Sequence, residues 1–156
     1  MTLGKLALRS LTLSVLSACI LIAASGPQLR FYEELEAQAS ELIKNASKVN
    51  PVIVNDTDIK SYPVPPGPAV KLLVRSDLGK SLQMLYLRHR VLRVIDHIGE
   101  GNKVVRRDLY HEELVRVQQF FDQENNLTQD NFLDTNGKVL HRKELPVAPP
   151  PPGWVY

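Results

Sequence analysis

Cysteine is nearly absent from this chain of 156 residues, which contains only Cys19. Because Cys19 lies in an apolar run close to the N-terminus, the rest of the chain can form neither an intrachain disulfide nor a cysteine-based zinc site. Small exported domains often depend on disulfides. Their absence therefore weighs against a secreted protein.

Complete metal-binding motifs are also missing. His111-Glu-Glu-Leu-Val115 begins like a zinc-protease helix, but position 115 is valine where the second histidine is needed. Aligning Asp134-Thr-Asn-Gly137 with a calcium loop puts Phe132 and Lys143 at the first and last ligand positions, where neither can serve. The four histidines, which include His89 and His97, are scattered. We therefore predict no metal site.

The sequence lacks phosphate-binding and nucleophile motifs as well. Gly79-Lys80-Ser81 would suit a phosphate loop, but the glycine required five residues before Gly79 is Val74. No serine lies in a nucleophile-elbow motif. We predict a protein that is not an enzyme and has no cofactor, although separate Asp, Glu and His side chains could still converge in space.

The strongest positive feature is an uncharged segment from Leu11 to Ala24, preceded by Lys5 and Arg9, with no acidic residue before Glu33. Its length, extended by the residues before Arg9, approaches the roughly 20 residues of a membrane-spanning helix. Basic residues ahead of it suit the cytoplasmic or matrix side of an anchor. The predicted membrane-anchor residues are Leu11, Leu13, Val15, Leu16, Ile20, Leu21 and Ile22.

Other interpretations of this segment remain open. Ala23-Ala24-Ser25 would allow cleavage as a secretory signal, and Leu16-Ser-Ala-Cys19 resembles a bacterial lipobox. A basic, Ser- and Thr-rich start without acids suits a mitochondrial presequence followed by an inner-membrane span. We favour a single-pass membrane protein of the mitochondrial inner membrane over one of the secretory pathway. Three glycosylation sequons, at Asn45, Asn55 and Asn126, would matter only in a lumenal location.

Behind this segment, the periodicity of apolar residues predicts a mainly α fold. The expected parts are a membrane anchor or signal at 1–25, an amphipathic helix at 26–50, a proline-rich extended linker at 51–69, a small helical domain with a β-hairpin at 70–145, and a proline-rich aromatic tail at 146–156. Within the linker and domain, 51–55 and 70–75 are strand candidates.

Two helices are expected in the domain, over 76–98 and 104–123, because apolar residues recur at spacings of three and four. Ser76 would cap the first helix, and Gly99 and Gly101 would end it. A short loop then favours an antiparallel helical hairpin. Asn136-Gly137 is the signal of a tight β-hairpin.

Charge is unevenly distributed along the domain. Residues 71–107 carry nine Lys or Arg against three acidic residues, a net +6, whereas residues 108–144 carry a net −4. The basic region could meet an acidic partner, anionic lipid or nucleic acid, or could pair with the acidic region internally. With a membrane segment and few interleaved aromatics, no nucleic acid partner is expected. The predicted partner-binding residues are Arg88, Arg90, Arg93, Arg106, Arg107, Trp154 and Tyr156.

These features predict a non-enzymatic, single-pass membrane protein that serves as an accessory subunit or assembly factor of a membrane protein complex. Its partners would be the other subunits of that complex and the lipid around the N-terminal segment. The alternative is a secreted or lumenal glycoprotein binding module with a cleaved signal peptide.

Overall fold

The computed structural model describes residues 28–76 and 81–145. It divides the chain into two compact units, Met1–Glu34 and Leu35–Tyr156. The predicted anchor at 1–25 and the aromatic tail at 146–156 lie outside the described residues. Among the described residues, no helix is long and apolar enough to cross a membrane.

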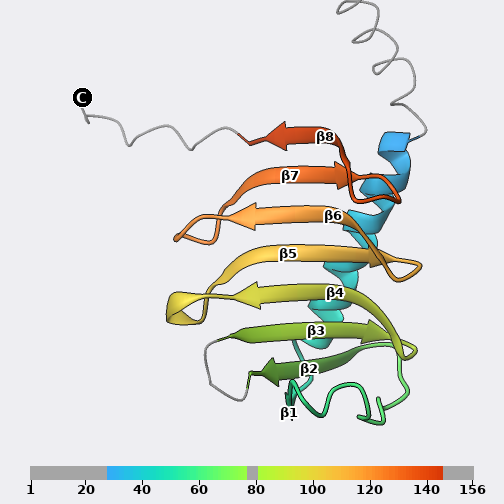
Figure 1. The fold of residues 1–156 in the computed structure, drawn as a ribbon, viewed down its shortest axis with the longest axis vertical. Coiled ribbons are helices and arrows are strands. Elements are labelled where there is room, and N and C mark those ends of the chain that lie inside the picture. The colour runs from blue at the N-terminus through green and yellow to red at the C-terminus, as the bar shows by residue number, and fades with distance from the viewer. Residues whose placement is uncertain (1–27, 77–80, 146–156) are drawn as a thin grey trace, which may run out of the picture. The chain divides into compact units, whose positions relative to one another are not determined.

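One eight-stranded sheet dominates the second unit, with its strands in the order of the sequence (Figure 1). Only β1 and β2 pair in parallel, and every later neighbour is antiparallel, as in a simple meander. The strands are β1 (Val52–Asn55), β2 (Val70–Arg75), β3 (Leu82–Arg88), β4 (Val91–Ile98), β5 (Val104–His111), β6 (Leu114–Phe121), β7 (Leu127–Leu133) and β8 (Val139–Glu144).

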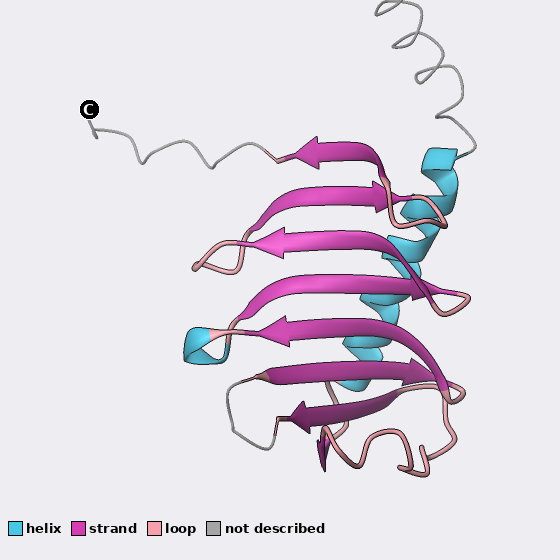
Figure 2. Ribbon diagram, in the orientation of Figure 1, coloured by secondary structure: helices cyan, strands magenta, loops and turns pink. Residues whose placement is uncertain are grey.

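The predicted mainly α fold is wrong, because 47% of the described residues are in strands and 19% are helical. The expected helix at 76–98 is the β3–β4 hairpin, and the one at 104–123 is the β5–β6 hairpin (Figure 2). Ser76 caps no helix: its backbone N–H donates to the carbonyl of Ser81 across the β2–β3 connection at 3.1 Å. Gly99 and Gly101 lie in the β4–β5 connection, which holds a short 3₁₀ turn at Glu100–Asn102.

Several local predictions are confirmed. A helix covers residues 28–46, within the amphipathic segment expected at 26–50. The strand candidates at 51–55 and 70–75 are β1 and β2. The Asn136-Gly137 signal forms the β7–β8 turn, where Gly137 has φ +80°. Positive φ is unfavourable for residues with a Cβ, so glycine suits this position.

The hairpins from β3 to β8 share one design. Each has backbone with positive φ at its turn, and the turns recur about every twelve residues, at His89-Arg90, Gly101-Asn102, Glu112-Glu113, Asn125 and Gly137. Each also has a β-bulge on its second strand, where one extra residue interrupts the register. The extra residues are Arg93, Val105, Arg116, Thr128 and Leu140.

The main core is a single row of side chains that crosses five strands. Each member pairs in register with the next, and all are buried: Tyr86, Val94, Leu109, Val117 and Phe132. Residues 35–46 of the helix face this row, since Leu35, Ala39 and Leu42 line a cleft together with Leu109. We call this the helix-side face, and the opposite one the open face.

The part of the helix that belongs to the second unit is about as long as this row is wide. Residues 35–46 span about 18 Å at 1.5 Å per residue. Five strands separated by about 4.8 Å extend over about 19 Å from β3 to β7. Residues 35–46 are therefore long enough to shield the apolar row from water.

A smaller core lies on the open face at the β1–β3 end. Val70, Leu72 and Val74 of β2 pack there with Leu85 and Leu87 of β3. The proline-rich segment covers them by contributing Ile59, Tyr62 and Val64. The segment expected to be a linker is thus part of the folded domain, and beyond this cluster the open face of β4–β8 has no such cover among the described residues.

Candidate functional site

Next to the apolar row, the helix-side face carries a buried ion pair. Arg107 on β5 donates two hydrogen bonds to Asp96 on β4, from Nε at 2.6 Å and from Nη2 at 2.9 Å. Asp96 is 1% exposed, and the guanidinium also lies 5.3 Å from the centre of the Phe121 ring. Burial and the neighbouring Asp96 carboxylate raise the pKa of Tyr86 to about 12. These contacts make Arg107 a structural residue rather than a free cation.

Two carboxyl groups meet where the helix crosses β7. Glu36 of the helix hydrogen-bonds Asp130, and Gln119 Nε2 donates to Glu36 Oε1 at 3.4 Å. Burial, together with Asp130, raises the pKa of Glu36 to about 8. Asp130 is 4% exposed, and its Oδ1 has no hydrogen-bond partner among the described residues. At neutral pH Glu36 therefore keeps its proton.

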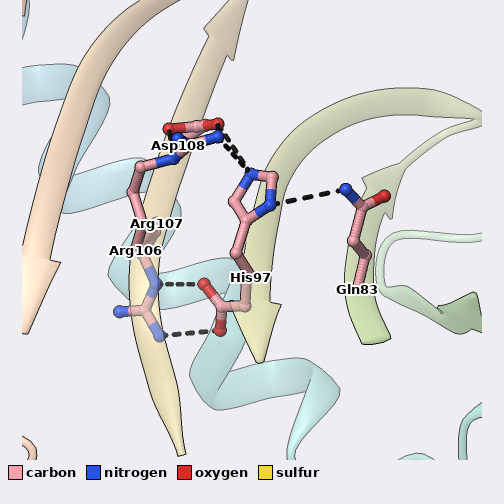
Figure 3. Close-up of polar contacts among 6 residues, drawn as sticks. Gln83, His97, Arg106, Arg107 and Asp108 are labelled. Atoms are coloured by element: carbon pink, nitrogen blue, oxygen red, sulfur yellow. Dashed lines mark hydrogen bonds and ion pairs between the residues drawn. The ribbon is translucent and has the colours of Figure 1, made fainter. Parts of the chain in front are cut away.

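The open face carries a line of polar side chains across β3, β4 and β5 (Figure 3). His97 Nε2 lies 2.8 Å from Asp108 Oδ2, and Gln83 Nε2 lies 3.4 Å from His97 Nδ1. Arg106 Nη2 lies 3.2 Å from the same Asp108 oxygen and 3.0 Å from His97 Nε2. Because a carboxylate only accepts, Nε2 carries the proton and donates to Asp108, which leaves Nδ1 to accept from Gln83.

This arrangement resembles the acid–histidine half of a catalytic triad but lacks its reacting end. In a triad, the second ring nitrogen of the histidine faces a nucleophile that it can deprotonate. Here that nitrogen faces the amide of Gln83, which has no proton to give up at ordinary pH. The array therefore presents no nucleophile to the histidine, and Asp108 is 3% exposed beneath Arg106.

The structure separates the predicted partner-binding arginines into two groups. Arg106 and Arg107 point to opposite faces of the sheet, and each is paired with an aspartate. Arg88, Arg90 and Arg93 gather at the β3–β4 hairpin instead, and their side chains form no ion pair or hydrogen bond with any described residue. Trp154 and Tyr156 lie outside the described residues. Three arginines without an ion-pair partner among the described residues thus lie together at one hairpin.

A cleft of about 380 Å³ opens between this hairpin and the helix. Its apolar wall includes Ala39 and Leu42 of the helix and Leu109 of β5, while Arg88 and Arg93 provide the cationic side. The remaining lining residues are Leu35, Gln38, His89, Val91 and Tyr110. Burial raises the pKa of Tyr110, so its hydroxyl remains a neutral hydrogen-bond donor.

Local backbone geometry fixes the cationic side of the cleft. Two residues, His89 and Arg90, form the β3–β4 turn with φ +50° and +68°, a type I′ geometry that favours Asn-Gly. The N–H of His89 donates to the carbonyl of Gly67 at 2.7 Å, which ties the turn to the proline-rich segment. Arg93 is the extra residue of the adjacent bulge, and bulges often redirect a side chain near a functional site.

Sequence reasoning missed the contacts of three residues in these sites. His97 was expected to be one of several scattered histidines, and neither Glu36 nor Asp130 was singled out. Reading β-strands would have placed Gln83, His97 and Arg106 in one cross-strand row. The twelve-residue recurrence of turn residues was the signal available for that reading.

The glycosylation and metal predictions stay predictions. Asn45, Asn55 and Asn126 are all exposed, as modification would require. Asn126 also donates from Nδ2 to Asp122 at 3.4 Å. Within residues 28–76 and 81–145, no three His, Cys, Asp or Glu side chains gather closely enough to hold a metal ion.

Comparison with known proteins identifies no relative of this chain. No family model, no curated protein and no solved structure matches the chain.

Proposed function

We propose that this chain is a non-enzymatic accessory protein of a membrane complex, anchored by its N-terminal segment and contacting an acidic partner through the β3–β4 hairpin. The observation that carries the proposal is that two arginines of the sheet are paired with aspartates while three others have no counterion among the described residues. Arg106 and Arg107 are neutralised within the sheet, whereas Arg88, Arg90 and Arg93 have no described counterion. Maintaining such a cluster of like charges is unfavourable in isolation, and an acidic partner would offset the repulsion.

The groups that could perform chemistry support the same proposal. Both ring nitrogens of His97 are engaged, and the Asp96 carboxylate is held by Arg107. Neither group is aimed at a cavity with a free nucleophile beside it. A binding role therefore suits the described surface better than acyl or phosphoryl transfer.

The test uses the full-length chain in membranes of the organism that encodes it. We expect the protein to resist alkaline extraction and to migrate in mild detergent with an assembly larger than itself. Arg90→Glu, which reverses an exposed charge at the turn, should reduce that association at least fivefold. Arg142→Glu, which reverses an exposed arginine on β8, is the matched control and should leave it unchanged.

Two results would count against the proposal. One is a protein released by alkaline extraction that migrates at its own mass. The other is equal loss of association in both charge reversals, since the contact would then not lie at the β3–β4 hairpin.

A further inference from the structure

We infer that the cleft between the helix and the β3–β4 hairpin is a binding site for a small organic anion with an apolar body. This inference deepens the proposed function, because it names a ligand for the hairpin assigned there to partner contact. It rests on the chemistry of the cleft walls, the volume between them and the absence of a counterion.

The cleft is lined by basic side chains and by no acidic one. Arg88 and Arg93 line it, and neither side chain has an ion-pair partner among the described residues. None of the lining residues is acidic. A guanidinium forms paired hydrogen bonds with a carboxylate or a phosphate, and such bonds are stronger than those between neutral groups. The head of the ligand is therefore an anion of this type.

The opposite wall is apolar. Leu35, Ala39, Leu42 and Leu109 contribute buried side chains to it, and none of these carries a polar atom. Val91, beside them, is 46% exposed. A ligand that covered Val91 would remove apolar surface from water, which is favourable. The body of the ligand is therefore apolar, with Gln38 and Tyr110 supplying neutral polar contacts at the rim.

The volume limits the size of the ligand. About 380 Å³ is the space that roughly a dozen water molecules take up in the liquid. An eight-carbon chain with a carboxylate or phosphate head fits within this volume, whereas a two-chain lipid is too large to be enclosed.

Binding is tested with the full-length protein in phosphatidylcholine nanodiscs, by calorimetric titration with empty nanodiscs subtracted. The probes are octanoate and octyl phosphate, which distinguish the two head groups. Octanamide removes the charge and acetate removes the apolar body. We expect saturable, one-to-one binding of octanoate or octyl phosphate, and at least tenfold weaker binding of octanamide and acetate.

Substitutions of residues that line the cleft test whether the ligand binds there. Arg88→Gln combined with Arg93→Gln should weaken binding at least tenfold. Gln38→Trp fills the cleft from the helix side while leaving both arginines, and should weaken binding similarly. Arg142→Gln is the control, because Arg142 is an exposed arginine on β8 that does not line the cleft, and it should change affinity less than twofold.

Three outcomes would overturn the inference. They are uptake of the probes that does not saturate, binding of octanamide as tight as that of both anions, or unchanged affinity in both the double arginine variant and Gln38→Trp. The proposed function is judged separately by association with a membrane assembly. A chain that binds octanoate but joins no assembly, or joins one and binds no probe, therefore refutes one statement and leaves the other.

Discussion

At the scale of single residues, the proton on Glu36 links helix docking to pH. Burial disfavours the charged form of this carboxyl group, and the neighbouring Asp130 adds to the effect, so the folded state keeps a proton on Glu36 that the unfolded chain would release. The resulting pH dependence of stability does not involve a histidine. It falls in the pH range in which most carboxyl groups are already ionised.

Glu36→Gln should remove most of this pH dependence. In the wild type the pKa of Glu36 is raised from 4.5 to about 8 in the folded state. The stabilisation is therefore complete below pH 4.5 and is lost as the pH rises through 8, because the unfolded chain ionises first. Urea midpoints between pH 5 and 9 should fall with pH in the wild type more steeply than in Glu36→Gln.

The exposed residue Glu41 of the same helix gives the control for that experiment. Glu41→Gln makes the same substitution at an exposed position and should keep the slope of the wild type. If Glu36→Gln and the wild type show parallel pH profiles, Glu36 does not keep its proton in the folded state.

The Arg107–Asp96 pair makes a second residue-scale prediction. Arg107→Ala leaves the carboxylate of Asp96 buried without its cation, and breaking a buried pair in this way costs about 3 kcal/mol. Chemical denaturation at pH 7 measures the loss. Arg142→Ala on β8, whose arginine is exposed, should cost less than about 0.5 kcal/mol. Equal losses would mean that Asp96 is not held by Arg107.

At the scale of elements, the hairpin turns differ in how well their residues suit them. Gly137 meets the positive φ of the β7–β8 turn without strain. His89-Arg90 and Glu112-Glu113 adopt positive φ in two-residue turns although all four residues carry side chains. Non-glycine residues in this region cost free energy that other contacts must offset.

Replacing His89-Arg90 by Asn-Gly should therefore stabilise the protein by about 1 kcal/mol. Thermal unfolding of the double variant against the wild type measures this. Replacing Glu112-Glu113 by Asn-Gly is the parallel case in the same turn type and should have the same sign. A lower melting temperature in both variants would show that these side chains make stabilising contacts that outweigh the strain.

The turns and bulges also explain why the strands were mistaken for helices. A bulge adds one residue, so apolar side chains on one face of a strand change from a spacing of two to a spacing of three. Leu92 and Ile95 flank the bulge at Arg93 in this way. Tyr110 and Leu114 are four apart because a two-residue turn lies between them. Both spacings imitate the period of an amphipathic helix.

Features set by short-range chemistry were predictable. Asn136-Gly137 marked a turn, and the alternation in 70–75 marked a strand, because each depends on neighbouring residues alone. The pairing of Glu36 with Asp130 depends on a helix and a strand that lie far apart in the sequence. Likewise, the split between paired and unpaired arginines follows from which strand face each one occupies, and this could not be read once the strands were taken as helices.

At the scale of the whole molecule, the fold depends on residues 35–46 to cover one face of the sheet. Leu42→Asp should destabilise the protein by at least about 3 kcal/mol, since it places a charge against Leu109 and the buried row. Unfolding by urea and binding of a hydrophobic dye would report the loss. Glu41→Asp, the adjacent exposed position, should behave like the wild type.

The match between residues 35–46 and the apolar row has a consequence for how such a sheet could be enlarged. Because neighbouring strands are consecutive in sequence, one more hairpin could be inserted without altering any existing connection. Two added strands would widen the sheet by about 10 Å, so about six further helical residues would be needed to cover their inward side chains. A hairpin gained without that cover would need a polar inner surface, so the helical residues that lie over the sheet set how many strands can carry apolar side chains on this face.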